Sequence, residues 1–578
     1  MNRPFPNSAA GTYPNSLPDS TSHSVPRSAI DIFLMLCIAV GVGLRILWVG
    51  ARELWYDEVL SVLLSSSQKN VYKLPDDVPF PISEISSRLV IPDEQSLTSS
   101  IETVKNLVKG TLGDPHPPLF YLSEHGWMRL FGNSEVALRS LVVLTSLITL
   151  GVAYFLGKRV LEQRGGLIFT ALLSLNPFFL SHSLNLRMYT AMVLWVVVSG
   201  WCLLMLTGTS TDNHVSSRVP AGWLRWLLRG GVAIAITAGM LTQYLFAYWL
   251  FVLVALVLYL DPKRWFQHGL TIGAGLLMFM PWALWGTRQQ MNNRQDVLNQ
   301  ISTVGGPLQS VVAHGKDLAQ TLGNHLLLGE LSTSMMPVAE PIKPTAVAIG
   351  CAVIGFLAMC VVSLYRRRQY RVLMIGVLMG LLPLAVALGA DVLTNKYTLG
   401  FGWGRSTIVA LPGCLLLIGA WLLGMGRWRS PLIVALLVVY LAIDVGDFAG
   451  RDRQIFHTVN AALLESNQPT LVVMNSRAWG HVLRLAYYLD ETANAEVLVT
   501  NPADVPAALQ SALSAADYQR VLWLRSDYPL WNAPDTEAEA EALSAETQRL
   551  LQAQYPSVET QSLTGTMNLD RFELQIYQ

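Results

Sequence analysis

Apolar runs long enough to cross a bilayer recur along the chain, with polar segments between them. A membrane-spanning helix needs about 20 mainly apolar residues. Eleven runs reach or approach this length, at 29–50, 136–156, 165–182, 188–207, 230–244, 245–260, 266–286, 344–364, 372–391, 405–424 and 430–447. The pattern therefore predicts a polytopic α-helical membrane protein with about 11 transmembrane helices.

Two assignments in this count rest on a choice. The apolar run 230–260 is longer than one ordinary span, so we read it as a helical hairpin that turns near Gln243–Ala247. The segment Pro117–Phe131 is also apolar, and we expect a helix there that lies on the outer surface of the membrane without crossing it. With both choices, the chain alternates regularly between the two sides of the membrane.

The basic residues of the short loops predict the orientation of the chain, because Lys and Arg are retained on the cytoplasmic side. If the N-terminus is cytoplasmic, every basic cluster of a short loop falls inside. These clusters are Lys158, Arg159 and Arg164; Arg218, Arg225 and Arg229; Lys263 and Arg264; Arg366, Arg367, Arg368 and Arg371; and Arg427 and Arg429. The loops 51–135 and 287–343 and the C-terminal segment are then predicted to be extracytoplasmic, and the loop 287–343 is a candidate lid.

The two ends of the chain differ from the apolar middle. Residues 1–28 are rich in Ser, Pro and Asn and are predicted to be a disordered cytoplasmic tail that precedes a retained signal anchor. Residues 450–578 alternate β-like and helix-like runs, which predicts a small soluble α/β domain. The predicted strands are Thr470–Met474, Glu496–Thr500, Arg520–Leu524 and Arg571–Tyr577, and the predicted helices are Trp479–Leu489, Pro506–Ala515 and Thr536–Ala553.

Composition supports the membrane assignment. The chain is 52% hydrophobic and 14% charged, whereas soluble domains carry about 25% charged residues. Its 40 basic and 40 acidic residues balance, so nothing favours a nucleic-acid partner. All five cysteines lie within apolar runs, which excludes a disulfide framework and a cysteine-based zinc site.

The first candidate for chemistry is the carboxylate pair Asp57–Glu58, directly after the first predicted span and flanked by Trp55 and Tyr56. Ionised carboxylates avoid hydrocarbon, so the pair is expected in the interface or in a wet cavity. When these residues are taken alone, the favoured explanation is an aromatic belt with charged flanks, which is common at the ends of spans.

The second candidate is the segment Gly113–Tyr121, which reads Gly-Asp-Pro-His-Pro-Pro-Leu-Phe-Tyr. Its prolines fix φ, remove backbone donors and prevent a helix from starting before Pro117–Pro118. The segment is therefore a rigid approach to the next helix that presents Asp114 and His116 at the interface. The alternative is that the prolines only shape a turn and that the histidine caps the helix.

Basic residues on the predicted outer face form the third candidate. Positive charge there runs against the usual bias, and snorkelling explains one or two such residues. Four of them beside a carboxylate pair indicate an anion site, and Arg suits phosphate because its planar fork binds two oxygens. The four are Arg139, Arg187, Lys396 and Arg405, and Tyr189, Gln243 and Tyr244 fall on the same face.

The Asp-Glu pair, the His-Pro-Pro-Leu-Phe-Tyr segment and the Asn-Leu-Arg-Met-Tyr start of a span together resemble the GT-C glycosyltransferases. The resembling branch contains the protein O-mannosyltransferases and the lipid A aminoarabinose transferase (glycosyltransferase family 39-like), mainly over residues 45–200. The resemblance implies a GT-C-like domain over 29–449 in the inner or plasma membrane. It also implies a polyprenyl-phosphate-linked sugar donor and transfer on the extracytoplasmic side.

The resemblance also implies residue roles. Asp57 matches the catalytic aspartate and Glu58 its acidic neighbour; His116, Arg187 and Tyr189 match further motif positions; and Arg405 fits a phosphate-contacting arginine. Gln243–Tyr244 stands where many members have His-Tyr, which weakens a metal or proton-transfer role for position 243.

The resulting hypothesis is an inverting transfer in which Asp57 takes the proton of the acceptor, which could be a protein, a lipid or a glycan. Arg405, with Arg187 or Lys396, would neutralise the departing phosphate, and Glu58 or Asp114 would orient the acceptor or help to retain a metal. The remaining substrate-binding candidates are His116, Tyr121, Arg139, Tyr189, Gln243 and Tyr244. A divalent metal stays open, because no tight spacing of ligands demands one.

The competing hypothesis is a lipid or saccharide transporter or flippase without covalent chemistry. Such proteins also have many spans and polar groups near the membrane. Against it, the sequence shows no inverted repeat or matching pair of interrupted helices. The candidate polar groups also collect on one face instead of at the membrane midplane.

Overall fold

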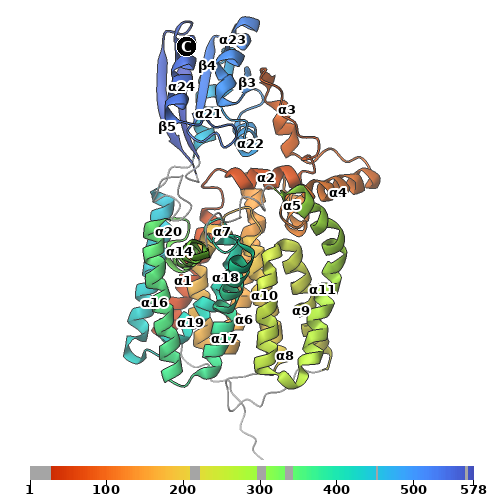
Figure 1. Cartoon of the computed structure of the whole chain (residues 1–578), viewed down its shortest axis with the longest axis vertical. Coiled ribbons are helices and arrows are strands. Elements are labelled where there is room, and N and C mark those ends of the chain that lie inside the picture. The colour runs from red at the N-terminus through yellow and green to blue at the C-terminus, as the bar shows by residue number, and fades with distance from the viewer. Residues whose placement is uncertain (1–27, 209–221, 296–306, 332–342, 451–453, 566–569) are drawn as a thin grey trace, which may run out of the picture.

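The computed structural model describes residues 28–208, 222–295, 307–331, 343–450, 454–565 and 570–578. The predicted disordered tail lies outside these residues except for Ser28, and so does Arg218. A bundle of long helices forms one part of the molecule, and a mixed α/β part stands at one end of it (Figure 1). The short helices of the first loop lie between the two parts.

The bundle confirms the predicted polytopic fold. Within the described ranges, nine helical segments are long and apolar enough to cross a membrane. The helices of the bundle are α1 (Ala29–Leu47), α6 (Glu135–Ser174), α7 (Pro177–Ser183), α8 (Tyr189–Leu206), α9 (Gly222–Thr242), α10 (Ala247–Leu260), α11 (Trp265–Trp282), α16 (Pro344–Arg366), α17 (Tyr370–Gly380), α18 (Leu382–Thr394), α19 (Leu411–Leu423) and α20 (Arg429–Ala449).

Helix α6 supplies two of the predicted crossings, because it reverses direction at Glu162, where φ is 64° and ψ is −176°. A Cβ atom at Gly166 would lie 3.0 Å from the carbonyl oxygen of Tyr154 and 2.9 Å from the amide nitrogen of Lys158. In a continuous helix, residues eight apart are about 12 Å apart along the axis. The two arms of α6 therefore pack antiparallel, with Gly166 at their closest approach.

The remaining predicted crossing is the apolar helix Tyr244–Leu260, which is shorter than an ordinary span. It follows α9 after a break at Gln243, whose backbone is extended, as the predicted hairpin requires. A helix thus occupies each of the eleven predicted ranges. In the apolar 18-residue window of Arg405–Leu423, 94% of the residues are buried, against 17% in the window of α1. Helix α19 therefore forms the centre of the bundle, and α1 lies at its edge.

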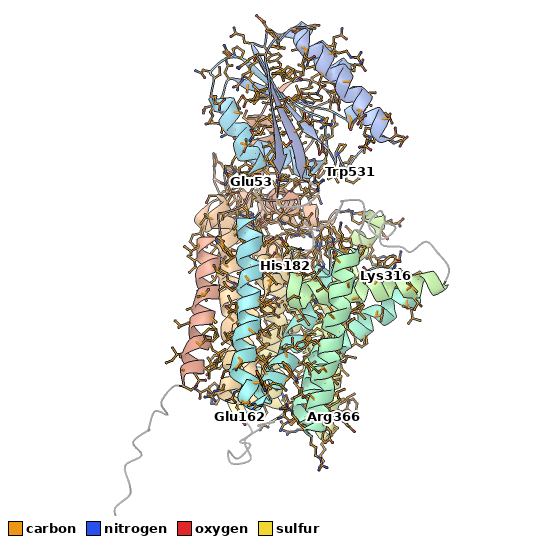
Figure 2. The ribbon with its side chains drawn as sticks, turned by 90° about the vertical axis from the view of Figure 1, so that its left-hand side faces the viewer. Glu53, Glu162, His182, Lys316, Arg366 and Trp531 are labelled. Atoms are coloured by element: carbon orange, nitrogen blue, oxygen red, sulfur yellow. The ribbon has the colours of Figure 1, made fainter. Side chains whose placement is uncertain are left out.

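The predicted cytoplasmic and extracytoplasmic loops lie at opposite ends of the bundle. Figure 2 shows Glu162 and Arg366 at the end opposite to Glu53. Glu162 lies within the basic turn of α6, and Arg366 begins the basic loop before α17. These two predicted cytoplasmic loops therefore share one end of the molecule, and the first loop lies at the other.

The first loop contains short helices and one strand: α2 (Tyr56–Ser65), β1 (Phe80–Pro81), α3 (Ser83–Ser86), α4 (Leu97–Thr111) and α5 (Leu119–Phe131). Helix α5 begins directly after Pro118, as the proline segment predicts, and packs against α2 and α6. Helix α2 begins after the extended residue Trp55, whose N–H donates to the Glu58 carboxylate at 2.9 Å. This hydrogen bond caps the helix end that carries Asp57.

The segment 287–343 is more helical than the predicted polar loop. A π-helical turn at Ala283–Thr287 joins α11 to α12 (Arg288–Asn293), and α14 (Pro307–Gly323) ends in a second π-helical turn at Asn324–Leu328. Helix α14 packs against α16 and α18. Residues 296–306 and 332–342 lie outside the described part of the chain.

The C-terminal part confirms the predicted α/β fold. Its six-stranded sheet has the order β1-β3-β2-β4-β6-β5, with β2, β3 and β4 parallel and β6 antiparallel to β4 and β5. The strands are β2 (Thr470–Met474), β3 (Ala495–Val499), β4 (Arg520–Ser526), β5 (Val558–Thr564) and β6 (Arg571–Tyr577). The helices are α21 (Ile455–Leu464), α22 (Trp479–Tyr488), α23 (Val505–Ala515) and α24 (Glu537–Gln552), and of these elements α21 and β5 were not predicted.

One strand of this sheet comes from the first loop. Phe80 pairs with Val497, and Pro81 pairs with Glu496, in an antiparallel contact between β1 and β3. The predicted boundary at residue 450 therefore divides elements that share one sheet. The first loop and the C-terminal segment form a joint structure on one end of the bundle.

Candidate active site

Asp57 and Arg405, far apart in the sequence, meet in the structure. Asp57 lies in the first turn of α2, and Arg405 begins the 3-10 turn η6 (Arg405–Ala410) that leads into α19. Arg405 Nη2 lies 3.1 Å from Asp57 Oδ2, and the two side chains are 15% and 23% exposed. The arginine also lies over the rings of Trp55 and Tyr189, at 5.2 and 5.6 Å. A carboxylate and a guanidinium thus face the same partly open position.

The loop before Arg405 needs glycine to aim this side chain. Gly402 has a φ of +59°, and a Cβ atom there would lie 2.2 Å from Arg405 Nε. Gly404 has a φ of +90°, and its carbonyl oxygen lies 2.8 Å from His325 Nε2 in the π-helical turn after α14. Such positive φ values favour glycine, which has no Cβ atom. The turn therefore directs Arg405 toward α2.

Glu58 faces the interior instead of the open position. It is fully buried, and Arg139 donates to its two oxygens through Nε at 2.8 Å and Nη2 at 2.7 Å. The N–H groups of Leu186 and Trp55 donate to the same carboxylate at 2.6 and 2.9 Å. The structure thus pairs Glu58 with Arg139 and leaves neither side chain facing the position that Asp57 and Arg405 share. Both were expected to meet substrate.

Arg187 holds α2 from a second direction. Its Nη1 donates to the hydroxyl of Ser61 at 2.9 Å and to the carbonyl oxygen of Asp57 at 3.2 Å. In the same turn, Asn185 Oδ1 accepts from the indole N–H of Trp55 at 2.9 Å. Arg187 is 4% exposed, so it acts mainly as a buried cation beneath Asp57. Tyr189, two residues on, presents its ring to Arg405.

Asp114, His116 and Tyr121 form a second polar cluster. Asp114 Oδ1 lies 2.8 Å from His116 Nδ1 and accepts from the Tyr121 hydroxyl at 3.1 Å. Burial opposes ionisation of Asp114, but the contact with His116 and the charges of Lys69 and Arg187 hold the pKa of its carboxyl well below the usual value. Burial lowers the pKa of His116, and the neighbouring Asp114 offsets this only in part. The cluster is therefore ordered around one carboxylate.

Tyr244 reaches this cluster through a residue that the sequence did not single out. The hydroxyl of Tyr244 donates to Gln290 Oε1, and Gln290 Nε2 donates to the carbonyl oxygens of Thr111 and His116, each at 2.7 Å. Gln290 lies in α12, just beyond the predicted end of a span. A polar residue at that position is the only sequence signal that could have indicated it. Gln243 is buried in the turn before Tyr244.

Lys396 lies in the loop after α18. Its N–H donates to the carbonyl oxygen of Asp391 at 3.1 Å, and the ring of its neighbour Tyr397 packs on His314 of α14 at 4.5 Å. These contacts place the backbone of Lys396 at the end of α18 and its neighbour Tyr397 beside α14.

The sequence leaves a divalent metal open, with Glu58 or Asp114 as residues that could help to retain one. Among the described residues, no group of three or more His, Cys, Asp or Glu side chains could hold a metal ion. The oxygens of Glu58 are occupied by Arg139 and two N–H groups, and Asp114 is engaged by His116 and Tyr121.

Comparisons with known proteins give a family match over part of the chain. Residues 115–285 match the sequence profile of the family described as dolichyl-phosphate-mannose-protein mannosyltransferase. No curated protein matches the chain.

Solved structures similar to the chain include ArnT from Cupriavidus metallidurans bound to undecaprenyl phosphate. That similarity covers 95% of this chain and 98% of that chain, with 13% identity and a TM-score of 0.39. Another is an oligosaccharyltransferase from Archaeoglobus fulgidus tethered with an acceptor peptide. It covers 85% of this chain and 69% of that chain, with 11% identity and a TM-score of 0.46.

The matched segment contains His116, Arg139, Arg187 and the Gln243–Tyr244 pair, whereas Asp57 and Arg405 lie outside it. The match confirms the resemblance that the motifs indicate, and it favours a transferase over the transporter alternative. The chain is a polytopic membrane glycosyltransferase, similar over this segment to the dolichyl-phosphate-mannose-protein mannosyltransferases.

Proposed function

We propose that the chain transfers a sugar from a polyprenyl-phosphate donor to an acceptor on the extracytoplasmic face, with inversion at C1. The observation that carries this proposal is the 3.1 Å contact between Asp57 and Arg405 at a partly open position. A general base and a phosphate-binding cation are the two groups that this reaction needs. The related structures support it, since one holds undecaprenyl phosphate and another an acceptor peptide.

In the proposed reaction, Asp57 removes the proton of the acceptor hydroxyl or amine as that group attacks C1 of the sugar. The bond between C1 and the phosphate oxygen breaks, and the lipid phosphate leaves with the bonding electrons. Arg405 receives the charge that develops on the phosphate, which is electrostatic stabilisation by a preorganised donor. Donor phosphate competes with Asp57 for Arg405, so donor binding frees the carboxylate to act as a base.

The other candidate residues divide into two groups. We assign Glu58, Arg139 and Arg187 the positioning of α2, because they are buried and bonded to it or to each other. We assign Asp114, His116, Tyr121, Tyr189, Gln243 and Tyr244 to the binding of sugar or acceptor, because the Asp114 cluster lies within electrostatic reach of Arg187 and Asp57.

The proposed orientation places the N-terminus in the cytoplasm, and the first loop and the domain 450–578 outside. The basic loops at Glu162 and Arg366 share the end of the bundle opposite to Glu53, which is the arrangement that the positive-inside bias produces. Polyprenyl-linked sugars would then reach Asp57 from the bilayer at the outer face.

The test uses the full-length protein in lipid nanodiscs with a polyprenyl-phospho-sugar labelled in the sugar. We expect release of polyprenyl phosphate that depends on added acceptor. Asp57→Asn is expected to lower the rate about 10²- to 10⁴-fold, the range typical of a general base. Asp76→Asn is the matched control, because Asp76 is an exposed carboxylate of the same loop.

A wild-type protein that releases no lipid phosphate from any such donor, or an Asp57→Asn variant with full activity, contradicts the proposal. The same assay separates the flippase alternative. A flippase would move the label across the bilayer of a vesicle without cleaving it from the lipid.

A further inference from the structure

The segment Arg52–Trp55 directly precedes the helix that carries Asp57, and residues of the bundle contact it from one side. Arg52 Nη2 lies 2.6 Å from Asp447 Oδ2 of α20. Arg139 donates to the carbonyl oxygens of Arg52 and Glu53 at 2.5 and 2.9 Å. The path of this segment therefore depends on contacts with α6 and α20.

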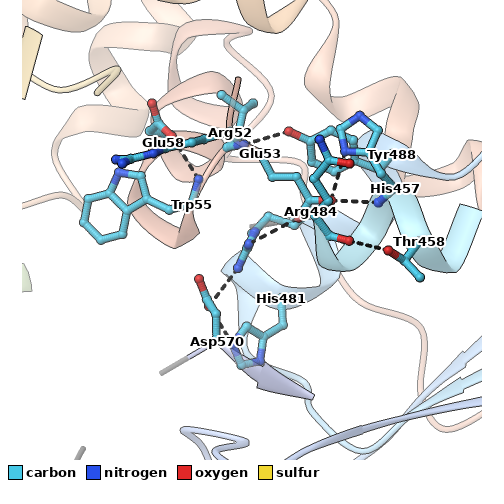
Figure 3. A network of polar contacts seen from close by, with 12 residues as sticks. Arg52, Glu53, Trp55, Glu58, His457, Thr458, His481, Arg484, Tyr488 and Asp570 are labelled. Carbon is cyan, nitrogen blue, oxygen red and sulfur yellow. Dashed lines mark hydrogen bonds and ion pairs between the residues drawn. The ribbon is translucent and has the colours of Figure 1, made fainter. Parts of the chain in front are cut away.

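The C-terminal domain holds the same segment from the other side (Figure 3). Glu53 Oε1 accepts from the backbone N–H of His457 at 2.7 Å and lies 3.0 Å from its Nδ1. Glu53 Oε2 lies 3.7 Å from Arg484 Nη2, and Arg484 Nη1 lies 2.7 Å from Asp570 Oδ1. Glu53, Arg484 and Asp570 are almost completely buried, so these charges are removed from water at the contact between the two parts.

A tyrosine of the C-terminal domain binds the backbone of the segment directly. The hydroxyl of Tyr488, at the end of α22, accepts from the Leu54 N–H at 2.7 Å and donates to Glu135 at the start of α6. One hydroxyl thus joins the C-terminal domain, the segment before Asp57 and the bundle.

We propose that the C-terminal domain is a positioning component of the active site, acting on Asp57 through Glu53 and Leu54. Helix α2 begins at Tyr56, directly after this segment. The path of the segment therefore determines the position of Asp57 in the first turn of α2. A small misplacement of a catalytic group costs much of its rate. Glu53, Arg484 and Tyr488 are then positioning residues. This inference rests on the proposed function, in which Asp57 is the base.

The chain offers a matched pair of variants for the test. Tyr487 and Tyr488 are adjacent on α22, and each sends a hydroxyl toward the bundle, but Tyr487 donates to the carbonyl oxygen of Asn133 at 2.5 Å, away from the segment. We expect Tyr488→Phe to lower kcat roughly 10- to 100-fold at an unchanged KM for the donor. Tyr487→Phe should leave both constants near their wild-type values.

A second pair of variants tests the buried charges around Glu53. Glu53→Gln removes the buried charge between His457 and Arg484, and it is expected to lower kcat in the same way. Its control is Arg477→Gln, which breaks another contact between the first loop and the C-terminal domain, the 2.8 Å pair of Arg477 and Asp77. Unfolding temperatures of all four variants separate a loss of stability from a loss of positioning.

Equal kcat values for Tyr488→Phe and Tyr487→Phe in an otherwise active enzyme overturn the inference. So does a Tyr488→Phe variant that changes only the KM for the donor, because positioning of the base acts on kcat. A wild-type protein without transferase activity would instead refute the proposed function. The two failures are therefore distinguishable.

Discussion

Asp57 and Glu58 are adjacent carboxylates with opposite surroundings. Successive residues of an α-helix point about 100° apart, so α2 turns one side chain toward the open position and the other toward the interior. Asp57 meets one guanidinium and stays partly exposed, whereas Glu58 is buried among four donor groups. Only Asp57 has the access that a base needs.

Phosphate binding by Arg405 should depend on the planar shape of its guanidinium as well as on its charge. A Lys side chain keeps the positive charge but loses the planar fork that binds two phosphate oxygens. We expect Arg405→Lys to lower kcat/KM for the donor about 10-fold and Arg405→Met to lower it about 10²- to 10³-fold. Steady-state kinetics with varied donor measures both effects.

Arg427→Met is the control for this series, because Arg427 is an exposed arginine of a predicted cytoplasmic loop. An Arg405→Met variant that keeps the wild-type kcat/KM would remove Arg405 from the reaction.

At this scale, the sequence predicted many members of the site and the meeting of Asp57 with Arg405, but not the partners of Glu58 or Tyr244. Adjacent carboxylates and outward-facing arginines are visible in the sequence, so Asp57 and Arg405 could be singled out and expected to meet. The division of labour between Asp57 and Glu58 depends on the helical phase of α2. The role of Gln290 depends on a contact between segments far apart in the sequence, and neither feature leaves a local pattern.

Helix α5 points the carboxyl group of Glu124 into the protein interior. Glu124 is fully buried, and neither of its oxygens meets hydrogen-bond geometry with a described residue. Burial raises the pKa of this carboxyl to about 8, and a nearby serine hydroxyl and the charge of Arg187 offset this only in part. The folded protein therefore holds a proton that the unfolded chain releases near pH 4.3.

Because the folded state binds the extra proton, stability should fall as pH rises from about 4.3 toward 8, by roughly 1.4 kcal/mol per pH unit for this group. Glu124→Gln should remove this slope and be more stable than wild type at pH 8. Thermal unfolding at several pH values measures the difference. Glu102→Gln, at an exposed position of α4, should leave the slope unchanged, and parallel curves for wild type and Glu124→Gln would contradict the prediction.

The apolar runs of the sequence predicted the boundaries of those helices that are surrounded mostly by lipid or by the protein core. The same signal failed for α14, which is amphipathic and lies within a stretch read as a polar loop. The reversal of α6 did follow from the apolar runs, because 136–156 and 165–182 predicted two crossings joined by a basic turn, and Glu162 lies within that turn.

The first loop and the C-terminal domain form one structure at one end of the bundle. Strand β1 is two residues long and completes a sheet whose other strands follow residue 469. Such a short strand has no detectable periodicity, so the sequence indicated two separate pieces. The buried charges at Glu53 and Arg484 were equally hidden, because an isolated carboxylate or arginine in the sequence does not reveal a distant partner.

This joint structure should respond to pH through His457. Its hydrogen bond to Glu53 raises the pKa of the imidazole. The charge of Glu135 raises it further, and partial burial opposes the rise. A raised folded pKa gives stabilisation that is fully present below about pH 6.5 and is lost as pH rises through the folded value. We expect the amides of α21 to exchange hydrogen faster, relative to their intrinsic rates, at pH 8.5 than at pH 6. His457→Asn should abolish that difference, and an unchanged difference would contradict the prediction.

The most direct test of the account is a cryo-electron microscopy structure of Asp57→Asn in nanodiscs with a bound polyprenyl-phospho-sugar. The account predicts phosphate oxygens within hydrogen-bonding distance of the Arg405 guanidinium. It also predicts C1 of the sugar facing residue 57, with room between them for one acceptor atom at about 3–3.5 Å from C1. A phosphate bound away from Arg405, or a sugar that faces away from residue 57, would contradict the central claim.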